Sequence, residues 1–543
     1  MKEELIELTK SMVNIPSVNG TSGEHDIGVF IENYLRDIPY FQKHPDYIII
    51  QPLRDDSLNR RNVFALLKGE KDDNSKTIIF HGHTDTVGVE DYGDLAEYAF
   101  DCDKLMDKLS EVQLSEEVRR DLESGDYIFG RGACDMKSGD AVFMVLIKHI
   151  AEHIEDFSGN ILLSCNPVEE NLHTGIIEGI DTLINIREQY HLEYVLAINN
   201  DYTCPMFQGD EHQYIYTGVV GKLLPCFYVR GRETHVGQCF EGFDPSSVVA
   251  GLVKNINLNP KFSDGYKGEY SLPPTVLKMK DLKPWYNVQT AKEAFIYFNY
   301  FVHNAGMEEI VSDLMAAARN AVDDTFSEYN SYYQKYCILS GKDYTTINYP
   351  CHVMTYAELK KLAEENNKSG EDIDDLLHKI SKKREQQGVD KREIPIELIR
   401  VLLSRAGIYE SVVVLYFAAP YCPHNTLQDA DEELITRLGK ITKEIEQEDK
   451  IEYNIHRFFP SLSDSSYLAI DDTESSIEYL ENNFPQMADL YPLPISKIRS
   501  LGIKAVNFGV HGKDAHKWTE RLYVPYSFEI LPKLIKKALN EFL

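Results

Sequence analysis

Two polar residues follow a short apolar run in the first part of the chain. The run Thr77–Phe80 leads into a polar segment that contains His83 and Asp85. Because these two residues are two positions apart, their side chains project to the same side of an extended chain. An imidazole next to a carboxylate suits a metal ligand with an orienting partner. A lone His-x-Asp pair is more often a polar strand end, so the interpretation depends on the residues downstream.

Acidic residues also follow two more predicted strands, over 161–165 and 194–198, and a further one lies in the glycine-rich turn 130–139. Carboxylates crowded into one crevice repel one another, and a multivalent cation offsets that repulsion. The turn lacks the glycine spacings of phosphate-binding loops, so the sequence does not favour a nucleotide site. The acidic residues in question are Asp135, Glu169, Glu170 and Asp201.

The elements that must position these residues alternate between strand and helix up to about residue 205. This alternation predicts an α/β domain with a mainly parallel sheet, in which the carboxyl ends of the strands meet in a crevice. From about residue 215 the pattern changes to a smaller α+β set, and the charged segment 338–408 is predicted to be a helical insertion within it. This change of pattern predicts a second, smaller domain that begins at about residue 215.

Composition limits the classes of function. The chain has 543 residues, more than one hydrophobic core normally supports. Its 56 basic and 87 acidic residues give a net charge of −31, so we expect neither nucleic acid nor an anionic membrane as a partner. We find no signal core and no apolar run long enough to span a membrane. The nine cysteines are scattered without a Cys-x-x-Cys pair, which is typical of reduced thiols in a cytoplasmic protein.

The order of these motifs resembles the M20 family of di-metal aminoacylases and exopeptidases. The segment 197–203 lies where that family has Glu or Asp followed by Pro-Thr. The similarity runs from residue 10 to the C-terminus apart from 338–408, and the length of the chain is similar to that of the arginine-utilisation branch. The other matching segments are His81–Val87, Gly130–Gly139, Val168–Glu170 and Ala515–Glu520.

The resemblance implies a catalytic domain over 1–214 and 425–543 that is split around an inserted lid over 215–424. It also implies two divalent cations, most often Zn²⁺ and alternatively Co²⁺ or Mn²⁺. It implies that Asp135 bridges the cations, that Glu169 is the general base and that Asp85 lies behind His83. His235 of the lid would be a second donor to the oxygen of the tetrahedral intermediate. The implied metal ligands are His83, Asp135, Glu170, Asp201 and His516.

The implied activity is hydrolysis of the amide, ureido or peptide C–N bond of a small N-acyl or N-carbamoyl amino acid of the arginine–ornithine group. A di- or tripeptidase is the alternative, and a non-catalytic binding protein on the same scaffold is the second alternative. The family often dimerises through the lid, so a homodimer is a candidate assembly. We expect His81 to be structural and His173 not to be a ligand. The segment 295–301 lacks the arginine with which many members hold a substrate carboxylate.

Overall fold

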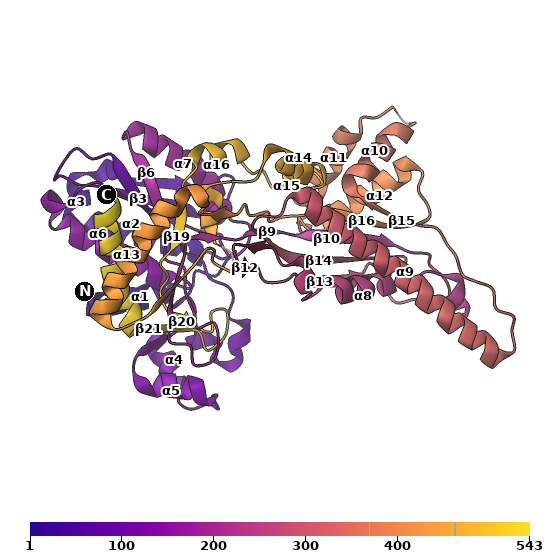
Figure 1. Cartoon of the computed structure of the whole chain (residues 1–543), viewed down its shortest axis with the longest axis horizontal. Coiled ribbons are helices and arrows are strands. Elements are labelled where there is room, and N and C mark those ends of the chain that lie inside the picture. The colour runs from indigo at the N-terminus through magenta and orange to yellow at the C-terminus, as the bar shows by residue number, and fades with distance from the viewer. Residues whose placement is uncertain (369, 461–462) are drawn as a thin grey trace. The chain divides into compact units, whose positions relative to one another are not determined.

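The computed structural model describes residues 1–368, 370–460 and 463–543, and the chain divides into two compact units. In Figure 1 the colours of both chain ends occur together in the first unit, which is built from separate stretches of the chain. The predicted catalytic segment 425–543 includes Asp472–Leu493, which belongs to the second unit. The first unit comprises Met1–Val220, His424–Asp471 and Pro494–Leu543, and the second comprises Gly221–Pro423 and Asp472–Leu493.

A mixed sheet with the strand order β1-β2-β5-β3-β6-β19-β7-β18 forms the centre of the first unit. The pairs β5–β3, β3–β6 and β6–β19 are parallel, whereas β2 is antiparallel to β5 and β7 is antiparallel to β19. The strands are β1 (Ile48–Pro52), β2 (Arg61–Lys68), β3 (Lys76–His83), β5 (Asn160–Asn166), β6 (Glu193–Asn199), β7 (Gln213–Tyr216), β18 (Tyr453–His456) and β19 (Ala505–Asn507).

The predicted mainly parallel arrangement is thus correct for the central strands, whereas β2, β7 and β18 run in the opposite direction. Strands β1, β2 and β3 are joined by short loops, and the structure places no helix in them. A chain that turns back without a crossover helix reverses its direction, so β2 runs opposite to β3 and β5. The alternation of elements in the sequence does not reveal this, because it gives the order of strands but not their directions.

Helices surround the central strands, and β3 is buried along its length from Thr77 to His83. Helix α6 packs on β3, where the rings of Phe80 and Phe143 stack with centroids 4.3 Å apart. Burial on both faces is what a parallel strand with an uninterrupted apolar run requires. The helices are α1 (Lys2–Val13), α2 (Gly23–Asp37), α3 (Pro39–Lys43), α4 (Cys102–Leu109), α5 (Glu116–Ser124), α6 (Lys137–Ala151), α7 (Thr174–Gln189), α13 (Glu432–Asp449), α16 (Ile495–Leu501) and α17 (Leu531–Phe542).

Two small sheets complete the first unit. Strands β20, β21 and β4 form a three-stranded sheet, and β17 pairs with β8. The first of these sheets brings the C-terminal motif to the glycine-rich turn, because β21 and β4 flank the two segments. Their bounds are β4 (Tyr127–Phe129), β8 (Gly218–Val219), β17 (Asn425–Thr426), β20 (Gly512–Lys513) and β21 (Arg521–Tyr523).

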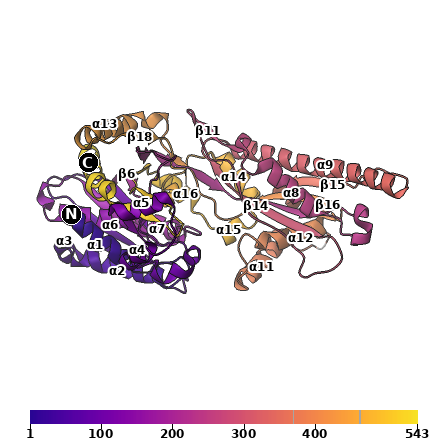
Figure 2. The same cartoon turned by 90° about the horizontal axis from the view of Figure 1, so that it is seen from below.

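The second unit has its own sheet, with the order β13-β14-β10-β16-β15 and β9 added to β14. Figure 2 labels β14, β15 and β16 of this sheet. Its strands are β9 (Gly221–Leu223), β10 (Pro225–Arg230), β13 (Thr275–Asp281), β14 (Glu293–Val302), β15 (Cys351–Thr355) and β16 (Ser411–Phe417), with the hairpin β11 (Gly265–Tyr266) and β12 (Glu269–Tyr270). Its helices are α8 (Pro245–Ile256), α9 (Met307–Ser340), α10 (Tyr356–Asn366), α11 (Ile373–Gln386), α12 (Ile394–Ala406), α14 (Glu474–Asn482) and α15 (Met487–Leu490).

The segment 338–408 contributes a strand as well as helices. Strand β15 pairs in parallel with β16, and α10 to α12 share one apolar core with β16. Thr355 and Glu358 form the capping box that begins α10. The segment therefore extends the sheet of the second unit and covers part of it.

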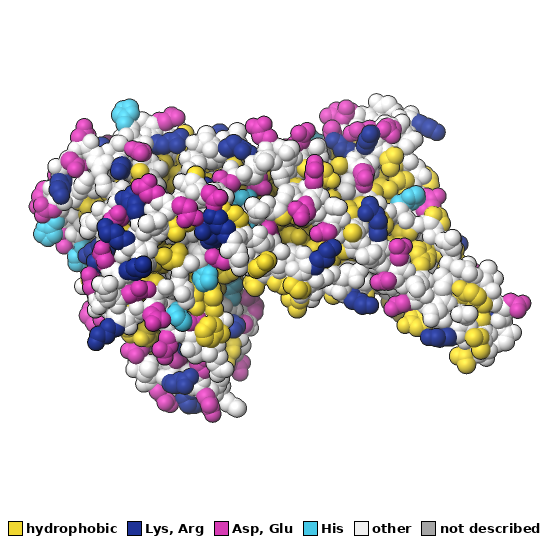
Figure 3. Space-filling model, in the orientation of Figure 1, with side chains coloured by type: hydrophobic (Ala, Val, Ile, Leu, Met, Phe, Trp, Pro, Cys, Tyr) yellow, Lys and Arg dark blue, Asp and Glu magenta, His cyan; other side chains and the backbone are white. Residues whose placement is uncertain are grey.

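The surface carries both signs of charge. Figure 3 shows acidic and basic side chains interspersed over the face in view. Exposed apolar residues include Ile338 and Leu339 near the end of α9, at 76% and 86% exposure. Across the described ranges of the chain, the helices are all too short or too polar to cross a membrane.

Candidate metal centre

Asp135 lies between two histidines. Its Oδ1 is 3.0 Å from Nε2 of His83, and its Oδ2 is 3.0 Å from Nε2 of His516. His516 Nε2 is also 2.9 Å from Oε1 of Glu170. Each oxygen of one carboxylate thus faces a different imidazole, which is the arrangement expected of a carboxylate that bridges two cations.

Two groups of side chains in this region could each hold a metal ion. In each group the candidate ligand atoms lie within 4.8 Å of one another, and Asp135 belongs to both. The structure therefore brings all five predicted ligands together, from segments far apart in the sequence. The first group is His83, Asp135 and Asp201, and the second is Asp135, Glu170 and His516.

The backbone is strained at the candidate ligand His516 and at Val168, close to the candidate ligand Glu170. Val168, which precedes Glu169 and Glu170, has φ +73°, and His516 has φ +64°. A β-branched residue in this left-handed region is unusual, and such conformations cost about 1–3 kcal/mol each. They cluster at functional sites, where the surrounding structure holds them. Here the turn at Val168 directs two consecutive N–H groups towards Asp85.

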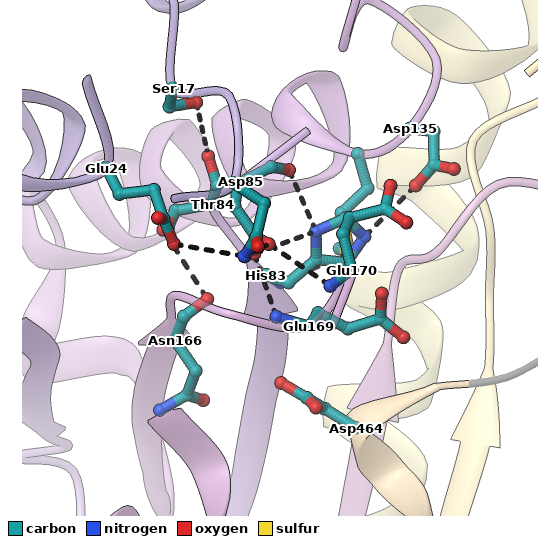
Figure 4. A network of polar contacts seen from close by, with 12 residues as sticks. Ser17, Glu24, His83, Thr84, Asp85, Asp135, Asn166, Glu169, Glu170 and Asp464 are labelled. Atoms are coloured by element: carbon teal, nitrogen blue, oxygen red, sulfur yellow. Dashed lines mark hydrogen bonds and ion pairs between the residues drawn. The ribbon is translucent and has the colours of Figure 1, made fainter. Parts of the chain in front are cut away.

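The Asp85 carboxylate organises the strand ends (Figure 4). Its Oδ1 accepts the N–H of Glu169 at 3.0 Å, and its Oδ2 accepts the N–H of Glu170 at 3.1 Å. Asn19 donates its side-chain amide to the same Oδ2 at 3.0 Å. Asp85 also lies behind His83, with 3.8 Å between Oδ1 and the His83 Nδ1. One buried carboxylate therefore links the end of β3 to the turn that follows β5.

Glu520 has no predicted role of its own, yet its carboxylate supports Asp135, the proposed bridging residue. Its Oε1 accepts the backbone N–H of Cys134 at 3.0 Å and that of Asp135 at 3.2 Å. Its Oε2 is 2.8 Å from Nη1 of the buried Arg131. Glu520 could have been identified from its place four residues after His516, in the segment Ala515–Glu520 that resembles the family. Glu520 holds the glycine-rich turn in place from the other end of the chain.

The electrostatics of the centre favour a bound cation. Burial raises the pKa of Asp201 well above its usual range, and the nearby Asp135 adds to this. Burial opposes protonation of His516, but its hydrogen bonds to Asp135 and Glu170 raise its pKa to about 11. Without a metal, these raised pKa values favour the protonated forms of the buried Asp201 and of His516. A mixed set of imidazole and carboxylate ligands suits Zn²⁺, Co²⁺ or Mn²⁺, so the residues fit the implied group.

The remaining candidates differ in their surroundings. Glu169 is 8% exposed, and burial raises its pKa well above the usual range. His81 is fully buried, and burial lowers its pKa to about 4, so it is neutral. His235 lies in the second unit, exposed on a turn, where its Nδ1 accepts the N–H of Gly237 at 3.0 Å. Its role remains a prediction.

The chain is similar to known proteins over its whole length. A profile of peptidase family M20/M25/M40 matches residues 79–540. Protein RocB of Bacillus subtilis is 36% identical over 539 residues, which cover 99% of this chain and 94% of that protein. Uncharacterized protein YqjN of the same organism is 32% identical over 548 residues, covering 100% and 97%. A solved tripeptidase structure from Staphylococcus aureus superposes with a TM-score of 0.54 at 13% identity, covering 100% and 98%, which shows a shared fold.

Proposed function

Because the chain belongs to peptidase family M20/M25/M40, it is a metal-dependent hydrolase of C–N bonds, and we propose that its substrate is a small N-acyl or N-carbamoyl amino acid. The bond cleaved is then an amide or ureido bond. We assign the amino acid to the arginine–ornithine group on the resemblance to the arginine-utilisation branch. The metal is proposed to be Zn²⁺, with Co²⁺ and Mn²⁺ as alternatives that the same ligands accept.

The observation that carries this proposal is the position of Glu169. It adjoins the candidate ligand Glu170, and Asp85 binds the N–H groups of both residues. One glutamate can therefore bind a cation while its neighbour stays free for proton transfer. A carboxylate with a raised pKa is suited to that task, because a general base works best near the operating pH.

In this mechanism Glu169 takes a proton from the attacking water as the water oxygen bonds to the carbonyl carbon. It then gives that proton to the leaving nitrogen as the C–N bond breaks, so one water is consumed and the base is restored. The bound cations supply polarisation of the carbonyl and a lower pKa for the water. Asp85 keeps Glu169 and His83 in place, and His235 is the proposed donor to the developing oxyanion.

A substrate panel tests the proposal. Metal-loaded protein is incubated with N-acetyl, N-succinyl and N-carbamoyl derivatives of L-ornithine and L-arginine, and with di- and tripeptides, and the free amino acids are measured by mass spectrometry. Each derivative is also offered as its α-carboxamide. Residues 295–301 lack the arginine with which many family members hold a substrate carboxylate, so the comparison shows whether a free carboxylate is needed. Preferred cleavage of the acyl or carbamoyl compounds supports the proposal. Preferred cleavage of peptides replaces it with the di- or tripeptidase alternative.

The same panel separates an enzyme from a binding protein on this scaffold. Glu169→Gln is expected to keep metal and fold and to lose about 10²–10⁴-fold in rate, the usual contribution of a positioned general base. If the variant matches the wild type, the role given to Glu169 is wrong. If metal-loaded wild type cleaves nothing, the non-catalytic alternative gains support.

A further inference from the structure

Another imidazole, that of His173, lies beside the proposed base. His173 Nδ1 is 2.8 Å from Oδ1 of Asp464 and 3.9 Å from Oε1 of Glu169. The ligand-type atoms of the three residues lie within 4.8 Å of one another, and all three side chains are buried. Figure 4 shows the carboxyl groups of Asp135 and Glu170 close together, with Glu169 turned to the side where Asp464 lies.

The His173 ring is held from several directions. Its residue begins α7 with φ +54°, and its N–H donates to the carbonyl of Val168 at 2.9 Å. The ring lies 5.2 Å from that of the buried Tyr467, and Asp464 belongs to the same short helical segment as Tyr467. The imidazole is therefore fixed relative to the turn that carries Glu169.

By contrast, the Glu169 carboxylate has no hydrogen bond within the described part of the chain. Two buried carboxylates as close as those of Glu169 and Asp464 repel each other. A proton on His173 Nδ1, the ring nitrogen nearest to both carboxylates, offsets this repulsion and favours one orientation of each. The 3.9 Å between His173 Nδ1 and Glu169 is about 1 Å longer than a hydrogen bond, a distance that a small change in the Glu169 side chain can close.

We propose that His173, oriented by Asp464, is a positioning residue that sets the direction of the Glu169 carboxylate for proton transfer. The proposal rests on the proposed function, in which Glu169 is the general base. It assigns a use to a histidine and an aspartate that the metal centre itself does not employ. Because a misplacement of about 1 Å can cost a factor of about 10² in rate, a positioning residue has a measurable effect.

The test compares two substitutions at one position. His173→Ala removes the ring, whereas His173→Asn keeps an N–H donor close to the position of Nδ1 and tolerates the left-handed backbone. On the panel substrate that the wild type cleaves fastest, we expect kcat of the alanine variant to fall about 10–100-fold with KM changed less than about threefold. The asparagine variant is expected to recover most of the loss. Asp464→Asn combined with His173→Ala is expected to be no worse than His173→Ala alone.

His191→Ala is the matched control, because His191 lies beyond the other end of α7 with φ +53° and is exposed. It should behave as the wild type. Metal per chain, measured by mass spectrometry, should be the same in His173→Ala as in the wild type. Loss of a metal ion from His173→Ala would show that His173 is a ligand, and the proposal would be overturned. Unchanged kcat, or a change in KM alone, would overturn it as well.

A structural measurement makes the test independent of turnover. Crystal structures of metal-loaded wild type, His173→Ala and His173→Asn should show the Glu169 carboxylate displaced only in the alanine variant. An unchanged Glu169 in His173→Ala overturns the positioning role even if no substrate is cleaved. Absence of turnover by the wild type, in contrast, counts against the proposed function alone.

Discussion

The Asp85 carboxylate accepts the backbone N–H of Glu169 at 3.0 Å. This contact joins the end of β3, which carries His83, to the turn after β5, which carries Glu169 and Glu170. Asp85 is fully buried, so the contact is shielded from water. The position of the proposed base therefore depends on a residue that need not touch a metal or a substrate.

Replacing Asp85 by asparagine should weaken metal binding. The amide keeps the size of the side chain but has one acceptor oxygen, so one of the two N–H groups of Glu169 and Glu170 is left unpaired. Loss of such a supporting contact typically costs about 10–100-fold in metal affinity. Titration against a competing chelator measures it, with the exposed Asp26→Asn as control. Wild-type affinity in Asp85→Asn would show that the contact is dispensable.

Replacing Glu520 should lower the free energy of unfolding, and alanine should lower it more than glutamine. Glu520→Ala leaves the N–H groups of Cys134 and Asp135 without their acceptor. It also removes one of the two carboxylates that pair with Arg131, so that Asp91 alone remains. Breaking a buried ion pair costs about 3–5 kcal/mol in the free energy of unfolding. Glu520→Gln keeps an acceptor for the N–H groups and should lie between the alanine variant and the wild type. Urea denaturation measures the order, and equal stability of the three proteins would contradict it.

Metal loading at pH 7 should release protons. His83 and His516 have raised pKa values in the absence of metal, and a group holds its proton below its pKa. A cation must displace these protons, so affinity should fall as the pH is lowered. Calorimetric titration with Zn²⁺ in two buffers of different ionisation enthalpy gives the number released, and His516→Ala should release fewer. A metal affinity that rises towards acid pH would contradict the protonated state of His83 and His516 in the metal-free protein.

The sequence indicates the residues of the metal centre but not all of the residues that hold them in position. His83 and Asp85 could be paired because they share one strand end, and Glu169 and Glu170 because they are adjacent. Asp464 could not be paired with His173, since no spacing rule connects residues so far apart in the chain. The antiparallel direction of β2 was missed for a related reason, because strand direction depends on connections rather than on the pattern of apolar residues. Asp472–Leu493 lies within 425–543 but belongs to the second unit, because the chain returns to that unit after Asp471, and chain order alone does not reveal this.

We propose that one carboxylate, that of Asp135, joins two cation sites. Metal content per chain, measured by mass spectrometry on purified wild type and on His516→Ala, tests it most directly. We expect about two metal ions in the wild type and fewer in the variant, which lacks one ligand of the second group. A wild-type protein that holds no metal after incubation with Zn²⁺, Co²⁺ or Mn²⁺ would contradict it.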